Sequence, residues 1–287
     1  MIATRRLYLV PLPGRPPLAL GARTLVMGII NVTPDSFSDG GVRFESERAI
    51  EDGLRMIAEG ADILDVGGES TRPGADALPA GEELRRVLPV VSGLAASGVT
   101  VSIDTYKAVV AREALAAGAV IVNDVSGLQF DAELAGVVAE SRAAVVLMHN
   151  RGRSREMYRE AEYANVSGEI TGELTLAIAR ATRAGVARDT VIIDPGLGFA
   201  KRAAHSYAAL ARLPDLVTLD CPILSGPSRK SFLTEAIGER PTEGREWGTA
   251  AAVAASVLLG AHIVRVHRVA EMVDVVRVAD RIRQEIR

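Results

Sequence analysis

The chain has 287 residues, 24% of them charged, and a formal net charge of −3. This near balance gives no support to wholesale binding of nucleic acid or of a membrane surface. The length is slightly above the roughly 250 residues of one (β/α)8 barrel. The single cysteine, Cys221, excludes an intramolecular disulfide and lies in an apolar run, so we expect it in the core.

Residues 1–24 are expected to form an arm or hairpin across the base of one catalytic domain, residues 25–287. Prolines at 11, 13, 16 and 17 interrupt the sequence after Arg5 and Arg6, so no signal-peptide core is expected. The most apolar stretch, Ala250 to Ala261, is too short to span a bilayer. We therefore expect a cytoplasmic protein with neither a membrane nor a nucleic-acid partner.

Eight short apolar runs follow, rich in valine and isoleucine. They mostly lack alternation of apolar and polar residues, as is typical of parallel strands buried on both faces. The expected strands are Leu25–Val32, Asp62–Gly67, Thr100–Asp104, Val120–Asp124, Ala144–His149, Val191–Asp194, Pro222–Ser225 and Ile263–His267.

Helical patterns separate these runs. Ser46 is expected to cap a helix with the apolar face Ile50, Leu54 and Ile57, ending at Gly60. Other helices are expected over Lys107–Ala117, up to Ala184 before Gly185, over Phe232–Ile237 and over Thr249–Leu259. The last is apolar nearly all round, which indicates burial in the fold or in a subunit contact.

The repeated alternation of strand and helix predicts an α/β protein with a single (β/α)8 TIM barrel. A doubly wound open sheet is the alternative, and it would gather ligand-binding residues at one switch point. Nearly every expected strand here ends in a polar residue, which favours the barrel.

Asp104, Asn123 and Asp194 end three of these strands and are expected to project toward the barrel axis. Carboxylates accept two hydrogen bonds, whereas an amide both donates and accepts, so the set suits a flat heterocycle with mixed edges. The alternatives are caps bonded to loop backbones and, with fewer nearby ligands, a metal site.

Arg265 and His267 lie two residues apart on the last strand, so they point the same way. A guanidinium fork and an imidazole donor suit a diphosphate, and the alternative is an arginine salt-bridged at the barrel rim. The run from Ser228 to Ser231 precedes a helix start, which favours an anion such as a carboxylate. Lys230 would instead lie over a ring of the ligand or bond to its oxygen, and the alternative is that the run is a solvated helix start.

Two long connections contain turn residues, Thr33–Gly41 after the first strand and Glu69–Ala75 after the second. Loops of this kind at a barrel mouth are often mobile lids, and the alternative is that they are ordinary surface turns. His149 ends the fifth strand in a position to face the pocket. Met148 beside it is expected in the core, and the alternative is that its thioether forms the floor for an aromatic ring.

Seven ordered motifs resemble the dihydropteroate synthase family, the folate-pathway enzymes inhibited by sulfonamides. The match covers nearly the whole chain after the N-terminal arm, and its first two motifs are highly specific. The matching segments are Gly28–Gly41, Asp65–Gly74, Ser102–Thr105, Asn123–Gly127, Asp194–Phe199, Ser228–Phe232 and Arg265–His267.

The resemblance implies a transferase that condenses 6-hydroxymethyl-7,8-dihydropterin diphosphate with para-aminobenzoate to give dihydropteroate and pyrophosphate. It also implies a homodimer and bound Mg²⁺, with Asn31 as the metal ligand. Asp35, Arg72, Lys230, Arg265 and His267 would be catalytic. The pterin diphosphate would contact Thr71, Asp104, Asn123, Met148, Asp194, Lys230, Arg265 and His267, and the para-aminobenzoate would contact Thr71, Arg72, Pro73, Phe199 and Ser231.

Three positions depart from the family pattern. Arg268 stands where an acidic residue is usual, and Ala200 and Arg202 stand where a glycine and a threonine are common. Alanine for glycine is harmless unless a positive φ is required there. Arg268 keeps open a catalytically silent pterin-binding paralogue. A pterin-dependent methyltransferase is a weaker alternative, because it would not be expected to need the Thr71–Pro73 segment or the Ser228–Ser231 run.

Overall fold

The computed structural model describes residues 5–32, 42–70, 74–153, 158–159 and 161–286. In this part of the chain, eight parallel strands form one sheet, with the spatial order β8-β7-β6-β5-β4-β3-β10-β9. The strands are β3 (Leu25–Asn31), β4 (Ile63–Gly67), β5 (Val101–Asp104), β6 (Ile121–Asp124), β7 (Ala144–Met148), β8 (Val191–Asp194), β9 (Leu224–Ser225) and β10 (Ile263–Val266). Their positions confirm the eight expected strands.

The sheet closes on itself. Strands β8 and β9, at opposite ends of the order, are joined by a parallel bridge between Ile193 and Ile223. The backbone N–H of Ile193 also donates to the carbonyl of Pro222 at 3.0 Å. Closure confirms the TIM barrel and excludes the doubly wound open sheet.

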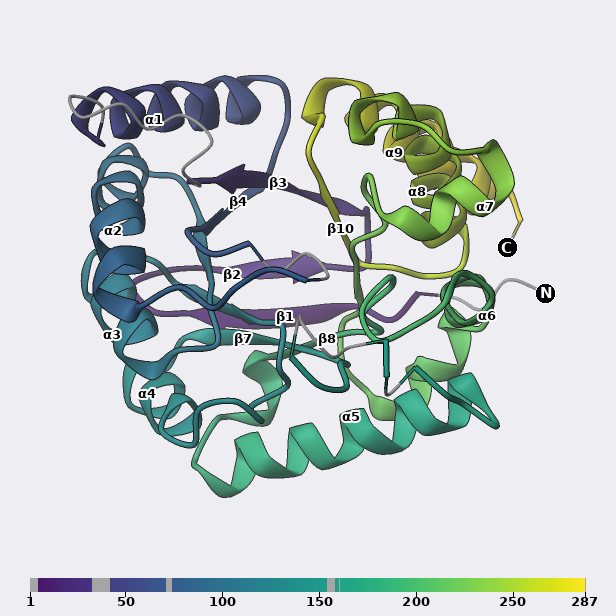
Figure 1. Ribbon diagram of the computed structural model, residues 1–287, viewed down its shortest axis with the longest axis horizontal. Coiled ribbons are helices and arrows are strands. Elements are labelled where there is room, and N and C mark those ends of the chain that lie inside the picture. The colour runs from purple at the N-terminus through teal and green to yellow at the C-terminus, as the bar shows by residue number, and fades with distance from the viewer. Residues whose placement is uncertain (1–4, 33–41, 71–73, 154–157, 160, 287) are drawn as a thin grey trace.

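Helices surround the barrel in chain order, as Figure 1 shows. They are α1 (Val42–Ala58), α2 (Ala80–Ala96), α3 (Ala108–Ala116), α4 (Leu134–Ser141), α5 (Val166–Arg183), α6 (Ala203–Ala211), α7 (Thr234–Ile237), α8 (Glu246–Leu258) and α9 (Val269–Glu285). Among the described residues, no helix combines the length and apolarity needed to cross a bilayer.

Two details of the expected helices are wrong. Helix α1 begins at Val42, so Ser46 lies inside the helix and does not cap it. Leu54 is 39% exposed, so it does not belong to the buried face of α1. The expected ends are sound, because Gly60 and Gly185 follow α1 and α5 with φ of +108° and +96°, a conformation that glycine adopts easily.

The N-terminal segment forms an antiparallel hairpin of β1 (Tyr8–Leu12) and β2 (Arg15–Leu20), which crosses the middle of Figure 1. Val10, Leu12 and Leu20 pack against the inward side chains at the amino ends of the strands, among them Met27 and Ile63. The hairpin therefore closes the base of the barrel, and the opposite end is left for a site.

Inward side chains follow one another at two-residue spacing because strand side chains alternate between faces. Four strands place an isoleucine in the basal cluster and a polar residue two positions nearer the carboxyl end. The pairs are Ile63 and Asp65, Ile121 and Asn123, Ile192 and Asp194, and Ile263 and Arg265. The same register that fills the base with apolar groups thus presents polar groups nearer the carboxyl ends of the strands.

A separate, larger apolar cluster fills the layer between strands and helices. It includes Cys221, which is 1% exposed, as expected for a core residue.

Candidate active site

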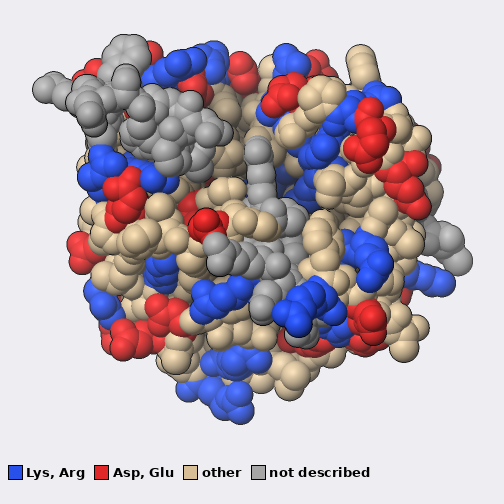
Figure 2. All heavy atoms as spheres, in the orientation of Figure 1, with Lys and Arg blue, Asp and Glu red and all other residues tan. Residues whose placement is uncertain are grey.

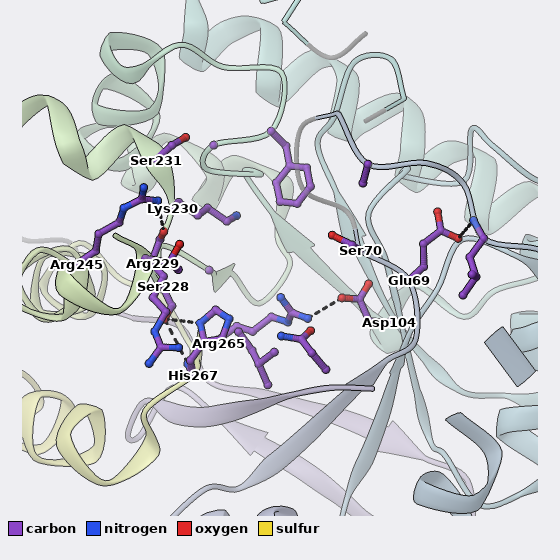
Figure 3. Close-up of a pocket in the computed structure, with 18 of the residues that line it drawn as sticks. Glu69, Ser70, Asp104, Ser228, Arg229, Lys230, Ser231, Arg245, Arg265 and His267 are labelled. Atoms are coloured by element: carbon purple, nitrogen blue, oxygen red, sulfur yellow. Dashed lines mark hydrogen bonds and ion pairs between the residues drawn. The ribbon is translucent and has the colours of Figure 1, made fainter. Parts of the chain in front are cut away.

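The carboxyl ends of the barrel strands border a pocket of about 690 Å³ among the described residues. This volume suits small-molecule ligands. Figure 3 shows side chains from several separate elements pointing into it. The predicted site residues that line the pocket are Asn31, Asp104, Phe199, Lys230, Ser231, Arg265 and His267.

Arg265 lies at the centre of a charged network in this pocket. Its Nε donates to Asp65 Oδ2 at 2.6 Å, and its Nη2 donates to Asp104 Oδ2 at 2.6 Å, the latter drawn in Figure 3. Burial raises the pKa of Asp104 to about 7, with Arg265 opposing this shift and the nearby Asp65 carboxylate adding to it. Arg265 is thus salt-bridged, as one sequence alternative held, and still lines the pocket.

Asn123, Asp194 and Met148 lie behind the pocket lining, with 3–4% of their surface exposed. Asn123 Nδ2 donates to Asp65 Oδ2 at 2.9 Å, which orients its amide. Asp194 Oδ1 accepts from the backbone N–H of Gly196 at 2.7 Å, and burial raises the pKa of its carboxyl group. Asp194 therefore acts partly as a loop cap, one of the alternatives considered for the strand-end residues.

Lys230 occupies the side of the pocket opposite Asp104. Its Nζ donates to the carbonyl of Leu197 and lies 4.3 Å from the centroid of the Phe199 ring. Burial lowers the pKa of Lys230 to about 8, and the Asp194 carboxylate opposes that shift. The amine therefore covers the ring of Phe199, and the expected contact of Lys230 with a ligand ring stays a prediction.

His267 is held by a serine that the sequence placed in an anion-binding run. Ser228 Oγ lies 2.9 Å from His267 Nδ1 and also accepts from the backbone N–H of His267 at 3.3 Å. Figure 3 shows both side chains beside Arg265 at the same edge of the pocket. The end of β10 thus presents an imidazole and a guanidinium together.

Several predicted residues are not placed at this pocket. Asp35, Thr71, Arg72 and Pro73 lie outside the described residues. His149 is 3% exposed and contacts Lys201 and Glu173, so the expectation that it faces the pocket is wrong.

Arg268 is exposed on the surface and pairs with Glu271 at 2.7 Å. It is absent from the pocket lining, so it adds no charge to the described wall. Arg268 therefore gives less support to the alternative that the protein is a catalytically silent pterin-binding paralogue.

The donor set fits a metal ion that is bound mainly by a ligand's own oxygens. Among the described residues, no group of three histidine, cysteine, aspartate or glutamate side chains is arranged to hold a metal. Asn31 lines the pocket and offers an amide oxygen. Mg²⁺ commonly keeps several waters and uses one or two protein ligands plus substrate phosphates, which this arrangement allows.

Sequence reasoning gave no role to three further groups. Asp65 bonds two site residues, as described above. Glu69 lines the pocket and accepts from the Tyr106 hydroxyl at 2.8 Å, and Arg245 lines it while donating to the Arg229 carbonyl at 2.9 Å. The sequence could have indicated Asp65 as an inward-facing polar residue, because it follows Ile63 by two residues just as Asn123 follows Ile121.

Comparisons with known proteins agree with this geometry. The family model described as pterin binding enzyme matches residues 27–267. The dihydropteroate synthase of Mycobacterium leprae is 49% identical over 259 residues, covering 88% of this chain and 91% of that protein.

Two solved structures are also similar. The Xanthomonas albilineans dihydropteroate synthase with 4-aminobenzoic acid has a TM-score of 0.86 and 44% identity, covering 95% of this chain and 98% of that one. The Yersinia pestis dihydropteroate synthase with a sulfonamide drug has a TM-score of 0.89 and 38% identity, covering 96% and 99%.

The closed barrel and its strand-end pocket are therefore those of a pterin-binding enzyme. Within that class, the chain belongs to the dihydropteroate synthase family, the transferases of folate biosynthesis.

Proposed function

We propose that the protein joins 6-hydroxymethyl-7,8-dihydropterin diphosphate to para-aminobenzoate in this pocket, with the site residues in the following roles. Asp104, Asn123, Asp194 and Lys230 hold the pterin, and Met148 packs on its face. Arg265 and His267 bind the diphosphate, and Phe199 and Ser231 contact the arylamine. The observation that carries this assignment is the convergence of Asp104, Lys230, Arg265 and His267 on one pocket, which offers a heterocycle edge and a diphosphate donor set together.

The atoms that would bind the pterin can be inferred from the hydrogen bonds that Asn123 and Asp194 make within the protein. Asn123 gives an amide hydrogen to Asp65, so its Oδ1 is the atom that accepts from a pterin N–H. Asp194 uses Oδ1 on the Gly196 backbone, which leaves Oδ2 for the heterocycle. Burial strengthens these contacts because water does not compete for them.

The reaction breaks the bond between the exocyclic pterin carbon and the diphosphate oxygen, and the electron pair leaves with that oxygen. The amine nitrogen of para-aminobenzoate then forms the new bond to carbon and loses one proton. Arg265 and His267 stabilise charge on the departing diphosphate, an effect worth about 3 kcal/mol for one well-placed donor. Mg²⁺, held by Asn31 and the substrate, would supply further charge stabilisation when bound.

Asp35, Thr71, Arg72 and Pro73 complete the proposal, with Asp35 helping to exclude water from the cationic pterin. Asp35→Ala is then expected to release more hydrolysed pterin per turnover. Full turnover without extra hydrolysis would contradict this role.

The proposed assembly is a homodimer. The side chain of Trp247 on α8 is 85% exposed, which supports a contact through this helix. Light scattering is expected to give twice the chain mass, and Trp247→Arg is expected to reduce it. The cytoplasmic location stays a prediction from the sequence.

The function is tested by measuring pyrophosphate release with Mg²⁺ and the pterin diphosphate, with and without para-aminobenzoate. We expect release that depends on para-aminobenzoate, dihydropteroate detected by mass spectrometry, and loss of activity when EDTA removes the metal. Tight pterin binding without release would instead identify a silent paralogue.

Arg265→Met and Arg268→Met form a matched pair for this assay. Removing the pocket guanidinium is expected to lower kcat about a hundredfold, since it removes a donor to the leaving group. Arg268 is exposed and pairs with Glu271 at the protein surface, so its variant is expected to keep the wild-type rate. Equal losses in both variants would contradict the assigned role of Arg265.

A further inference from the structure

Lys201 is a buried basic residue that the reaction described above does not use. It is 1% exposed, and its Nζ lies 3.1 Å from the Gly196 carbonyl, 3.0 Å from the Phe199 carbonyl and 2.8 Å from His149 Nδ1. Burial lowers the pKa of Lys201 well below its usual value. The His149 carbonyl lies 3.4 Å away, so the N–H groups of the amine face several acceptors, which offsets much of the cost of burying it.

His149 links this amine to an acidic side chain. Its Nε2 lies 3.0 Å from Glu173 Oε2, so the ring proton belongs on Nε2 and Nδ1 is left to accept from Lys201. Burial, followed by the nearby Lys201, lowers the pKa of His149 to about 4, which keeps the ring neutral. Glu173 is paired in turn with Arg151. The line from Lys201 to Glu173 therefore runs from the loop after β8 to helix α5.

The loop held by Lys201 has an unusual backbone. Gly196, Gly198 and Ala200 all have positive φ, at +68°, +78° and +46°. Alanine at such an angle costs about 1 kcal/mol relative to glycine, so the surroundings must impose this conformation. Ala200 therefore stands where a positive φ is required, and its replacement of the family's glycine carries a cost.

Four carbonyls of this loop accept hydrogen bonds from side chains of Lys201, Lys230 and Tyr163. Lys201 binds those of Gly196 and Phe199, as described. Lys230 donates to the Leu197 carbonyl, and the Tyr163 hydroxyl donates to the Ala200 carbonyl at 3.0 Å. The outer side of the same loop supplies Gly198 and Phe199 to the pocket wall.

We propose that Lys201 is a positioning residue for the arylamine substrate, because its Nζ holds the Gly196–Ala200 loop from behind and thereby sets the place of Phe199 against Lys230. Lys201 is 1% exposed and its Nζ is directed at the Gly196 and Phe199 carbonyls and at His149, so it acts through the loop. This inference rests on the proposed function, since it concerns the acceptor side of that reaction.

The test is Lys201→Met, which keeps most of the unbranched apolar side chain and removes its hydrogen-bond donors. We expect the KM for para-aminobenzoate to rise about tenfold, because a displaced wall misaligns the acceptor, while the Kd for pterin diphosphate changes less than about threefold. Hydrogen–deuterium exchange is expected to increase in the peptide containing residues 196–200 and to stay unchanged in the basal strands.

The matched control is Arg202→Met. Arg202 is the adjacent basic residue but is exposed, so the variant is expected to keep wild-type KM and exchange. Lys201→Gln retains two N–H donors on a shorter side chain and is expected to give an intermediate KM. It provides the test if the methionine variant does not fold.

A folded Lys201 variant with wild-type acceptor KM and unchanged loop exchange would overturn the inference. A rise in exchange across the whole barrel would also overturn it, since that would show a general stabilising role. Failure of the proposed function is distinguishable, because the wild-type protein would then make no dihydropteroate, whereas the exchange measurement needs no turnover.

Discussion

Asp65 is not proposed to contact the substrate, but it bonds two residues that are, Asn123 and Arg265. Its side chain is fully buried, and its Oδ2 accepts from Asn123 and from Arg265, which lie on β6 and β10. Strand β4 thus orients groups that reach it from other strands. Such supporting hydrogen bonds matter because a site must hold its contacting groups in one geometry.

Asp65→Asn is expected to lower kcat/KM about thirtyfold, within the range seen when residues that orient ligand-binding groups are changed. The amide has nearly the same shape but carries no negative charge, so its single oxygen is a weaker acceptor for Asn123 and Arg265 and the ion pair with Arg265 is lost. Steady-state kinetics with varied pterin diphosphate would measure the loss.

Asp220→Asn is the matched control for this variant. Asp220 is 65% exposed and pairs with Arg6 at the protein surface, so its change should leave the kinetics unaltered. Wild-type kinetics in a folded Asp65→Asn protein would show that Asn123 and Arg265 are oriented without this carboxylate.

Residue-level prediction succeeded where a side chain's position follows from its own strand. Asp104 was found because it ends a buried run, and it lines the pocket. The neighbours of His149 could not be found in this way, because Lys201 lies 52 residues further along the chain. Its burial and partner follow from the packing of the β8 loop against the end of β7.

At the scale of elements, the hairpin β1–β2 has two unlike faces. Leu20 is 1% exposed and belongs to the cluster at the barrel base, whereas Leu9 is 66% exposed on the other face. The barrel base would otherwise expose Met27, Ile63 and their neighbours, so the hairpin contributes to the core.

Leu20→Ala is expected to destabilise the protein by about 3 kcal/mol, since it removes a fully buried side chain and leaves a cavity. Leu9→Ala removes the same atoms from the exposed face and is expected to cost less than about 0.5 kcal/mol. Urea unfolding of both variants would measure the difference. Equal losses would mean that the hairpin does not contribute to the core in this orientation.

Elements were predictable because buried parallel strands are visible as runs of valine and isoleucine. Strand β9 is the main exception, since only Leu224–Ser225 form it where Pro222–Ser225 were expected. Proline has no N–H to give to a neighbouring strand, so Pro222 contributes only its carbonyl, to Ile193. The start of α1 was missed because Ser46 was taken as a cap, although serine also occurs inside helices.

At the scale of the whole molecule, the surface has charged side chains of both signs, whereas the barrel base contains a buried histidine that is neutral. Lys, Arg, Asp and Glu side chains are interspersed over the face shown in Figure 2, in keeping with the small net charge. The base instead contains a neutral imidazole. His262 Nδ1 accepts from the Ile223 N–H at 3.0 Å, and Nε2 lies 3.1 Å from the Arg6 carbonyl. His262 therefore joins the N-terminal segment to the strand that closes the barrel.

This contact makes stability depend on pH. Burial lowers the pKa of His262 to about 4, with Arg5 adding to the shift, from 6.5 for an unperturbed histidine. The unfolded chain then binds one more proton between these values, so the stabilisation is complete above pH 6.5 and is lost as the pH falls toward 4. His149, whose pKa is also lowered to about 4, adds a second proton in the same range.

We therefore expect His262→Gln to lower the slope of the free energy of unfolding against pH by about 1.4 kcal/mol per pH unit below pH 6. The contribution of His149 should persist in the variant, and so should the opposing contribution of Asp104, whose pKa is raised to about 7 in the folded protein. Urea unfolding at intervals from pH 7 to pH 4.5 would give both slopes. Leu9→Ala, which changes the same N-terminal hairpin without a titrating group, should keep the wild-type slope. An unchanged slope in His262→Gln would mean that this histidine is already protonated in the folded barrel, and that the neutral contact to Ile223 does not control its closure.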